Sequence, residues 1–518
     1  MRFRNHISIF LAAILLLAFF SAPAYAVSHA QAGIPQPVAF TSAMPVRGAY
    51  LPASRSYAFL GVPYARVASY FTDAVPLEPT NAVFDATSLG AVSPQMNLFA
   101  DQTVPYYGNA SNDCLNLNIW TPSLSGGLRP VIVQFHGGGL SCGSAGVPEI
   151  SGANLAGAEN CVVVNVNHRL NVFGFLNLSD YGEKYANSQN QGIRDLVMAL
   201  RWVKANAPAF GGDPDNVTVM GQSGGGIKVL ALMSCPDADG LFQKAVIQSA
   251  ITEQYDGRFH SEALSKQIAA NVLKRLSVDP DDIDAIQSKS IQEIQAAAAR
   301  ALLDTADQNG VPSLGSGARA IGWTPVLDDR IIAADPSVSG FPAWTDEIPL
   351  LVGSTLSEWN TATRPQNVPA SGENGLTAAY RAAFFAYPGV SVQPWAVDTR
   401  FRNVALSLAD AKAAQSAPVY NYVWTYTWAH CSELPVIFRN TASTGPYAAC
   451  TAGSAMSSMA SALWASFARD GSPSCQAIRA WPVFAKDSRG TMSLGLQPRF
   501  AVDHDKELLR ILSTWENM

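Results

Sequence analysis

The chain has 518 residues and a formal net charge of -6 at pH 7, and 14% of its residues are charged, compared with about 25% in typical soluble proteins. This composition favours a large, well-buried globular body. The chain contains no cluster of five or more basic residues, which argues against a nucleic-acid partner. No stretch reaches the length of a membrane helix, so we expect no membrane span.

Residues 1–26 are typical of a secretory signal. Arg2 and Arg4 precede the apolar run Ile9–Phe20, and small residues follow at Ala24-Tyr25-Ala26. This order matches the charged, apolar and cleavage regions of a signal peptide. The apolar run is too short to cross a bilayer comfortably. We therefore expect these residues to be removed and the mature protein to be secreted or periplasmic.

The chain contains seven cysteines. An oxidising compartment would be compatible with one or more disulfides, and the odd count leaves at least one thiol unpaired. The cysteines show neither C-x-x-C spacing nor a nearby histidine cluster, so the sequence predicts no zinc site. We expect no metal and no cofactor. The cysteines are Cys114, Cys142, Cys161, Cys235, Cys431, Cys450 and Cys475.

Several apolar runs, each followed by a turn signal, have the composition of buried parallel strands. Between two of them lies Gln191–Asn206, in which apolar residues repeat at the three- and four-residue spacing of a helix. Strands that alternate with helices predict an α/β fold with a mostly parallel central sheet. The strands are expected at 131–135, 161–166, 217–220, 245–248, 349–352 and 420–426.

Two stretches of helical composition interrupt this alternation, near 252–322 and 361–415. Insertions at such places in an α/β sheet lie over the carboxyl ends of the strands, where ligands bind. They are therefore candidate cap or pocket walls. The chemistry described below draws on residues from Gly138 to His430, so we predict one catalytic domain over 27–518 rather than several smaller ones.

A G-x-S-x-G sequence follows directly on the strand-like run at 217–220. This order is typical of a nucleophile elbow, a sharp turn from a strand into a helix that exposes a serine. The turn strains the serine backbone, and Gly221 and Gly225 remove side chains that would clash there. Ser223 is the candidate nucleophile.

A serine hydroxyl needs a general base, most often a histidine held by a carboxylate. Five of the seven histidines are excluded because they lie in the signal, beside the new amino terminus, in another motif, or ahead of any plausible acid. His430 and His504 remain, and the strand-like 420–426 could deliver His430 to the sheet edge. The excluded histidines are His6, His29, His136, His168 and His260.

The acid should lie between Ser223 and His430, because α/β hydrolases follow the chain order serine, acid, histidine. Glu358 follows the predicted strand at 349–352 across a short turn. Asp328 and Asp329 follow another apolar run and remain alternatives on spacing alone.

A tetrahedral intermediate also needs preorganised N–H donors for its oxyanion. His136-Gly137-Gly138-Gly139 follows a predicted buried strand and is similar to the HGGG loop of lipases and esterases. We expect donors from the backbone of Gly138, Gly139 and Gly224, the last being the residue after the nucleophile.

Together these motifs resemble the type B carboxylesterase family of α/β hydrolases, which includes cholinesterases and bacterial esterases. The resemblance covers nearly the whole mature chain and implies the α/β-hydrolase fold with helical cap insertions. It also implies Glu358 rather than Asp328 or Asp329 as the acid, and His430 rather than His504 as the base. The matching segments are 59–65, 112–118, 136–139, 167–176, 210–226, 241–249 and 430–438.

The chain departs from the family pattern in the region before Cys114. Ser93 stands where the family usually has a cysteine, so the family's disulfide to the position of Cys114 cannot form. Asn112 replaces an expected acidic residue, and the arginine expected around Tyr70 is missing. The resemblance therefore predicts that this region lacks a disulfide and a salt bridge common among its relatives.

Two further departures concern the substrate. Gln222 stands where many relatives have glutamate, and the aromatic residue that binds choline in cholinesterases would fall near Val104. Both changes weaken a cation site. We therefore expect small-molecule neutral esters rather than choline esters, with Tyr106-Tyr107 as a candidate pocket wall.

The resulting hypothesis is a secreted serine carboxylesterase that works through an acyl-enzyme intermediate. Two alternatives remain. One is a catalytically idle binding or adhesion protein of the same fold, because fold does not guarantee function. The other is a hydrolase of thioesters, lactones or activated amides with the same triad.

Overall fold

A computed structural model describes the greater part of the chain. The predicted signal, Val104, Tyr106-Tyr107, Cys450 and most of the second predicted insertion lie outside the described residues. Within them, no helix is long and apolar enough to cross a membrane. The described residues are 36–96, 108–250, 259–311, 321–356, 358, 399–427, 429–442, 453–504 and 506.

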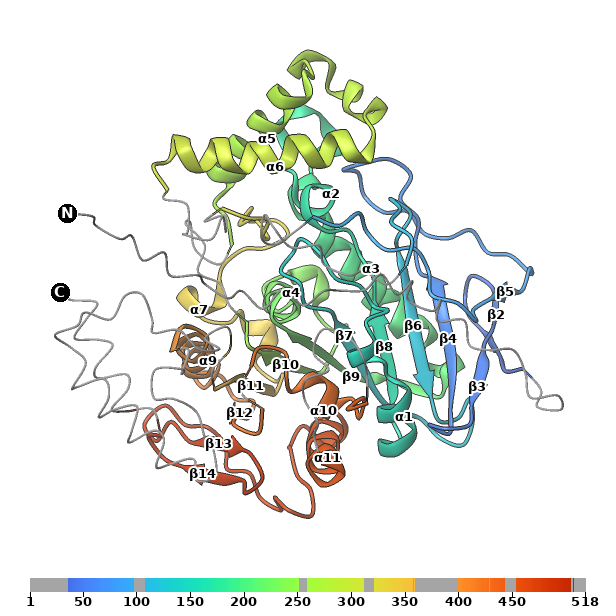
Figure 1. Ribbon diagram of the computed structural model, residues 1–518, viewed down its shortest axis with the longest axis vertical. Coiled ribbons are helices and arrows are strands. Elements are labelled where there is room, and N and C mark those ends of the chain that lie inside the picture. Colours follow the sequence, from blue (N-terminus) through green and yellow to red (C-terminus); the bar gives the residue numbers. More distant parts are fainter. Residues whose placement is uncertain are drawn as a thin grey trace, which may run out of the picture.

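An 11-stranded sheet runs through the molecule in the order β14-β13-β12-β11-β10-β9-β7-β8-β6-β4-β3 (Figure 1). Neighbouring strands from β8 to β13 are parallel, and the strands at both edges are antiparallel. The strands are β3 Ala49–Leu51, β4 Ser56–Pro63, β6 Asn116–Thr121, β7 Arg129–Phe135, β8 Val162–Val166, β9 Gly212–Gln222, β10 Lys244–Gln248, β11 Leu350–Thr355, β12 Val419–Trp424, β13 Thr491–Leu494 and β14 Arg499–Ala501. A separate 3-stranded sheet contains β1 Val38–Phe40, β2 Pro45–Arg47 and β5 Phe84–Asp85.

The predicted mostly parallel sheet is confirmed, and a strand is present at each of the six predicted places. The largest difference in bounds is at β9, which begins at Gly212 rather than near 217. Gly212, Pro214 and the two aspartates ahead of Val217 are residues typical of turns, but Gly212 pairs with Arg129 of β7 across a register shift. Pairing with a neighbouring strand thus overrides the local composition.

Successive residues of the central strands belong alternately to two hydrophobic cores, one on each face of the sheet. On β7, Val131, Val133 and Phe135 belong to one core and Ile132 to the other. Side chains of a strand alternate between its faces, so a run that is apolar throughout is buried on both sides. Helices α3, α4 and α9 contribute to the first core, whereas α1, α10 and α11 contribute to the second.

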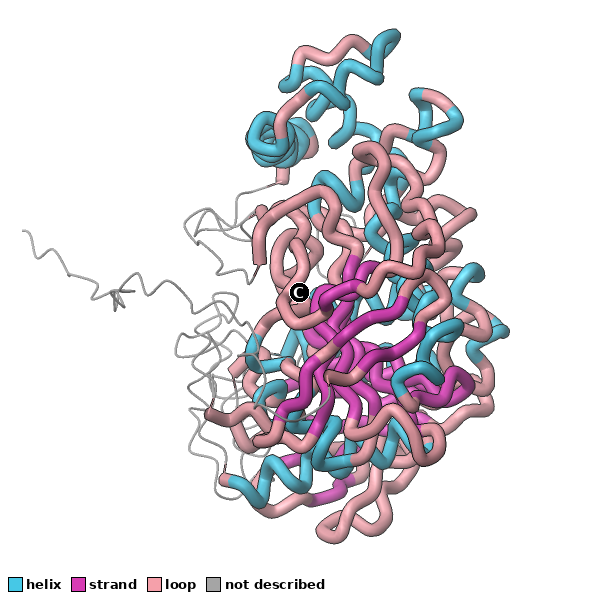
Figure 2. The backbone as a smooth tube through the Cα atoms, turned by 90° about the vertical axis from the view of Figure 1, so that its right-hand side faces the viewer, coloured by secondary structure: helices cyan, strands magenta, loops and turns pink. Residues whose placement is uncertain are grey.

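Figure 2 shows the strands twisting through the middle of the molecule with helices on both sides. The predicted helix at Gln191–Asn206 is confirmed with these bounds as α3. The other helices of this body are α1 Ala153–Glu159, α2 Asn171–Phe175, α4 Gly224–Leu232, α7 Pro336–Ser339, α9 Thr399–Lys412, α10 Leu434–Ile437 and α11 Ser454–Asp470. Short 3-10 helices are η1 Pro148–Ile150, η2 Ser179–Tyr181, η3 Glu183–Tyr185, η4 Ser188–Asn190, η5 Ala207–Phe210, η6 Pro236–Ala238 and η8 Ala343–Thr345.

The first predicted insertion forms one end of the molecule, at the top of Figure 1. It contains α5 Glu262–Leu276, η7 Pro280–Ser288 and α6 Ile291–Gln308, and α5 packs against α6. The second differs from the expectation in its described part. Helix α9 packs against β11 and β12, so it belongs to the layer that flanks the sheet.

The cysteines of the described part are all free thiols. Cys114 is buried, and the hydroxyl of Ser93 accepts a hydrogen bond from the backbone N–H of Leu170 at 3.1 Å. The serine that replaces the family's cysteine thus ties its own segment to the loop after β8 by a hydrogen bond.

Arg169, after β8, and Asp195, on α3, form a fully buried ion pair. Their side chains are 1% and 0% exposed. Asp195 accepts hydrogen bonds from the backbone N–H, Nε and a terminal nitrogen of Arg169 at 3.1, 2.8 and 2.6 Å. The remaining guanidinium donors bind the carbonyl of Thr72 at 2.6 Å and the side chain of Gln191 at 2.9 Å.

Candidate active site

Five neighbouring parallel strands, β12, β11, β10, β9 and β7, place the predicted site residues together at their carboxyl ends. His430 follows β12, Glu358 follows β11 and Ser223 follows β9, while the loop beginning at His136 follows β7. Carboxyl ends of adjacent parallel strands meet at one edge, where α/β folds bind ligands. Residues far apart in the sequence are thereby collected in one place.

Ser223 occupies a strained turn between β9 and α4. Its φ is 58° and its ψ is -126°, a conformation that side-chain-bearing residues rarely adopt. Its N–H donates to the carbonyl of Gln248 at 2.9 Å. A Cβ on Gly221 would overlap the backbone of Gly225, and one on Gly225 would overlap the carbonyl of Phe135. The two glycines therefore permit the strand, turn and helix to approach closely enough to hold this turn.

Glu358 and His430 form a hydrogen-bonded pair. Oε2 of Glu358 contacts Nδ1 of His430, and the backbone N–H of His430 donates to the Glu358 carbonyl at 3.0 Å. The other carboxylate oxygen accepts from the hydroxyl of Ser249 at 2.6 Å and from the N–H of Thr355 at 2.7 Å. Because Nδ1 donates to the carboxylate, Nε2 carries no proton in the neutral ring and is the nitrogen that can accept one.

The surroundings of His430 act on its pKa in opposite directions. Burial favours the neutral ring, whereas the neighbouring Cys431 and the Glu358 carboxylate favour the charged ring, and the net effect raises the pKa well above that of an ordinary histidine. Among the described contacts, no hydrogen bond joins Oγ of Ser223 to His430. Catalytic hydrogen bonds often close only when substrate binds.

A neutral amide lies beside the imidazole. Nε2 of Gln222 is 3.4 and 3.5 Å from the two ring nitrogens of His430, and Oε1 accepts from the thiol of Cys431 at 2.9 Å. The ring of Phe401, on α9, lies 5.1 Å from the imidazole ring, centroid to centroid. Gln222 therefore brings no charge to the position next to the imidazole.

The three peptide groups of the glycine loop after β7 are each held by a hydrogen bond to their carbonyl. The carbonyl of His136 accepts from Nζ of Lys228 at 2.8 Å, and that of Gly137 is bound by Nδ1 of His136 at 2.8 Å. The carbonyl of Gly138 accepts from the N–H of Cys142 at 3.1 Å. In a planar trans peptide the following N–H points the opposite way. The N–H groups of Gly138 and Gly139 are thus aimed by the carbonyls that precede them.

The glycine loop lies directly against the start of α4. A Cβ on Gly224 would overlap the carbonyl of Gly139. Gly138 and Gly139 have φ values of 95° and 61°, a region that favours glycine. Since the first N–H groups of a helix have no partner within the helix, the N–H of Gly224 and those of the loop can serve one oxyanion.

A second buried carboxylate, Glu433, lies near the pair and was not singled out from the sequence. Burial and the charge of Glu358 raise its pKa to about 8. Its Oε1 accepts from the side-chain amide of Gln248 at 3.4 Å. The carboxyl that contacts the His430 ring is that of Glu358, whereas the one of Glu433 is bound to Gln248.

The alternatives left open by spacing lie elsewhere. Asp328 accepts hydrogen bonds from the side chains of Gln189 and Asn190 at 2.7 and 3.0 Å, and from the N–H groups of its own loop. Asp329 adjoins it, and His504 follows β14 at the edge of the sheet. None of the three contacts His430 or Ser223 in the described structure.

The residues that support Glu358 and His430 were not predicted from the sequence. Ser249 and Thr355 hold the carboxylate, and Phe401 and Cys431 border the imidazole. Ser249 follows β10, which lies in the sheet between β9, the strand before the nucleophile, and β11, the strand before the acid. This position at the carboxyl end of β10 is the signal that could have indicated it.

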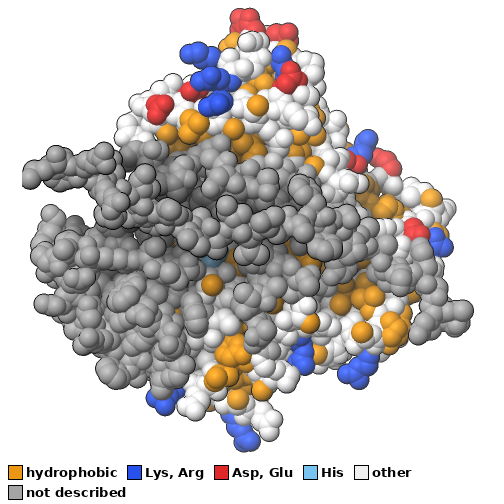
Figure 3. Space-filling view, viewed as in Figure 1, with side chains coloured by type: hydrophobic (Ala, Val, Ile, Leu, Met, Phe, Trp, Pro, Cys, Tyr) orange, Lys and Arg blue, Asp and Glu red, His pale blue; other side chains and the backbone are white. Residues whose placement is uncertain are grey.

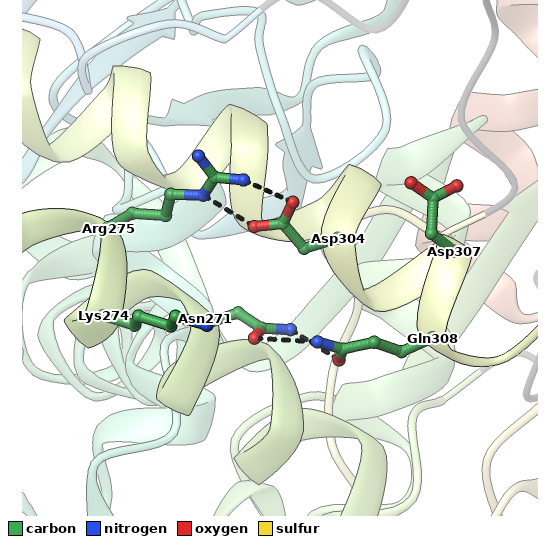
Figure 4. Close-up of a pocket in the computed structure, with 6 residues that line it drawn as sticks. All are labelled: Asn271, Lys274, Arg275, Asp304, Asp307 and Gln308. Atoms are coloured by element: carbon green, nitrogen blue, oxygen red, sulfur yellow. Dashed lines mark hydrogen bonds and ion pairs between the residues drawn. The ribbon is translucent and has the colours of Figure 1, made fainter.

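A pocket of about 580 Å³ lies between α5 and α6, at the end of the molecule where charged side chains gather in Figure 3. Four of its six side chains pair with one another: Arg275 with Asp304 at 2.5 Å, and Asn271 with Gln308 at 2.9 Å (Figure 4). None of the predicted triad residues lines it. We therefore regard it as a solvated polar surface of the inserted helices.

A nucleophile elbow at the carboxyl edge of a mostly parallel sheet flanked by helices defines the class of α/β hydrolases. The model of the carboxylesterase family matches residues 35–377, so the chain belongs to the carboxylesterase family. It is a carboxylic-ester hydrolase of the type B group that the sequence motifs resemble.

Characterised relatives and solved structures agree with this assignment. The chain is 30% identical over 471 residues to the para-nitrobenzyl esterase of Bacillus subtilis, covering 86% of this chain and 92% of the relative. It is 29% identical to the phenmedipham hydrolase of Pseudarthrobacter oxydans, covering 89% and 96%. A structure described as an esterase from Clostridium hathewayi that can hydrolyse aliphatic aromatic polyesters superposes with a TM-score of 0.79 and 32% identity, covering 92% of this chain and 98% of that one.

Proposed function

We propose that the protein hydrolyses neutral carboxylic esters through an acyl-enzyme on Ser223. Nε2 of His430 takes the proton of the Ser223 hydroxyl as its oxygen attacks the ester carbonyl, and the N–H groups of Gly138, Gly139 and Gly224 bind the oxyanion. The imidazolium then protonates the leaving alcohol. Water, deprotonated by His430, releases the acid and regenerates the serine.

The proposal is supported by the strained elbow at Ser223, by the contact of the preceding Gln222 with His430 of the Glu358–His430 pair, and by the close approach of the glycine loop to Gly224. Glu358 orients the imidazole through Nδ1 and stabilises its charged form during the reaction. A fold used only for binding has no need of this backbone strain, which structures usually retain at functional sites.

Neutral esters are the proposed substrates because Gln222 brings no charge to the position beside the imidazole. A cationic alcohol group would gain nothing from it. The para-nitrobenzyl esterase and phenmedipham hydrolase among the relatives make aromatic esters suitable probes. A panel of p-nitrophenyl, p-nitrobenzyl, thioester, lactone and thiocholine substrates should show the highest kcat/KM for the neutral oxygen esters. A preference for thiocholine or for thioesters would contradict the assignment.

The mechanism is tested by Ser223→Ala. We expect kcat to fall by about 10⁶-fold, the loss that removal of a triad serine causes in other hydrolases, with the melting temperature preserved. Ser234→Ala, just after the same helix, is the matched control, because the hydroxyl of Ser234 donates to the carbonyl of Leu230 in that helix at 3.3 Å. Full activity in Ser223→Ala would exclude Ser223 as nucleophile. Inactivity of the unmodified chain together with no labelling by a fluorophosphonate would favour the binding-protein alternative.

We further propose that the protein acts outside the cytoplasm after loss of residues 1–26, on the basis of the charged, apolar and small-residue order at the amino terminus. The amino-terminal sequence of protein recovered from the periplasm or the medium should begin near Val27. Recovery of the unprocessed chain from the cytosol alone would contradict this.

A further inference from the structure

Lys228 is a fully buried lysine that the reaction above does not use. It lies on α4, its side chain is 0% exposed, and its ammonium donates to the carbonyl of His136 at 2.8 Å. Lysine is rarely buried without an ionic partner, because removing an ammonium from water is costly. Among the described residues, no carboxylate pairs with it.

The groups around Lys228 confirm that its charge is not compensated. Cys142, three residues after the glycine loop, interacts with it electrostatically, and so do His136 and His168, whose ring centroids are 5.2 Å apart. Burial, aided by the charge of Lys228, keeps the pKa of both histidines well below the usual value. Asp195, on the adjacent α3, is occupied by Arg169. Burial in turn lowers the pKa of Lys228 to about 7.

The position of Lys228 on α4 explains what this side chain can do. Gly224 and Lys228 are four residues apart, so they lie on the same face of the helix. Gly224 abuts the carbonyl of Gly139, at one end of the glycine loop, while Lys228 binds the carbonyl of His136, at the other. One face of α4 thus contacts both ends of the loop.

We propose that Lys228 is a positioning residue that ties the glycine loop to the helix carrying Ser223, and so fixes the oxyanion donors relative to the nucleophile. This inference rests on the proposed function. The hydrogen bond to the His136 carbonyl sets the plane of the first peptide of the loop. The His136 ring then holds the next carbonyl, and the N–H of Gly138 points away from it. Donors preorganised in this way need not reorganise when the oxyanion forms.

The test is Lys228→Met, which keeps the length of the side chain and removes the donor. We expect kcat to fall by about 10- to 100-fold with KM changed less than about threefold, a smaller loss than the ~10²–10³ for deleting an oxyanion donor itself. The Ki of a trifluoromethyl ketone, which forms an oxyanion on the serine, should rise by the same factor by which kcat/KM falls. Lys228→Gln, which keeps an N–H donor, should recover part of the activity.

The melting temperature of Lys228→Met distinguishes a positioning role of Lys228 from a purely structural one. Replacing a buried ammonium that has no carboxylate partner by an apolar side chain removes the cost of burying the charge but leaves the His136 carbonyl without this donor, so the melting temperature should change little. Lys412→Met is the matched control, because Lys412, the last residue of α9, is also 0% exposed and donates to the carbonyl of Thr345 at 2.9 Å. Lys412→Met should leave kcat unchanged. Rates are expressed per active site titrated with a fluorophosphonate.

Wild-type kcat and ketone affinity in Lys228→Met would overturn the inference, as would a loss of activity matched by an equal loss of folded protein. The proposed function is judged separately. If Ser223→Ala is inactive while Lys228→Met retains full activity, the esterase mechanism stands and only the role of Lys228 fails. If Ser223→Ala remains active, both fail.

Discussion

Two buried carboxylates of this protein have nearly the same surroundings and different roles. Asp195 and Glu358 are both 0% exposed, and each accepts three hydrogen bonds from its neighbours. Asp195 is paired with Arg169, and Glu358 with His430. Burial and pairing therefore do not distinguish the site of chemistry from a structural ion pair.

The partners make the difference. A guanidinium does not lose its proton in proteins, and the donors of Arg169 are also bound to Thr72 and Gln191. An imidazole titrates within the physiological range, and the side chain of His430 is 12% exposed, compared with 1% for Arg169. We infer that Asp195 serves stability and Glu358 serves catalysis, which predicts opposite results for the two substitutions.

The largest effect is expected for Glu358→Gln. The amide keeps the shape of the side chain but no longer stabilises the imidazolium, so kcat should fall by about 10⁴-fold, as for the equivalent change in another serine hydrolase. Its melting temperature should stay close to that of the wild type. An active Glu358→Gln variant would contradict the assignment of the acid.

Glu358→Gln should also change the pH dependence of kcat/KM. In the proposed mechanism the neutral form of His430 is the base, and the Glu358 carboxylate contributes to its raised pKa. Wild-type kcat/KM should therefore be lost on acidification at a pH above the usual range of histidine. Glu358→Gln removes the carboxylate charge and should therefore lower the pKa of His430. The acid limb of the residual activity should then move to lower pH, and an unmoved limb would show that Glu358 does not act on the imidazole.

The second effect is expected for Asp195→Ala, which leaves a buried guanidinium without its partner. The free energy of unfolding should fall by about 3–5 kcal/mol, while kcat per folded molecule stays close to wild type. Urea denaturation measures the first and active-site titration the second. Asp85→Asn is the control, because its ion pair with Arg47 is exposed and should contribute at most about 1 kcal/mol. Equal losses in the two variants would remove the distinction between the pairs.

The smallest effect is expected for Ser249→Ala. It removes one of the three hydrogen bonds to Glu358, and a hydrogen bond to a charged group contributes about 1.5–3 kcal/mol. We expect kcat/KM to fall by about tenfold, measured with p-nitrophenyl acetate, because the remaining bonds still hold the carboxylate. A loss as large as that of Glu358→Gln would mean that Ser249 alone orients the acid.

Much of the fold was predictable because its elements carry local signals. The strands around Ser223 are apolar on both faces, and α3 has a helical period, so the sequence predicted both correctly. The start of β9 and the packing of α9 on the sheet were not predictable, because they depend on pairing and contacts with elements distant in the sequence.

The sequence by itself determined the candidate nucleophile and the glycine loop, since each is a contiguous motif whose residues are required by the turn that they form. Spacing alone did not exclude Asp328 and Asp329 as alternatives to Glu358 until the family resemblance was considered. Only the tertiary structure decided which carboxylate contacts His430, that Ser249 supports it, and that Lys228 reaches the loop. These contacts are made between residues that follow different strands, or between a helix face and a loop. No local pattern encodes the order in which the strands lie side by side.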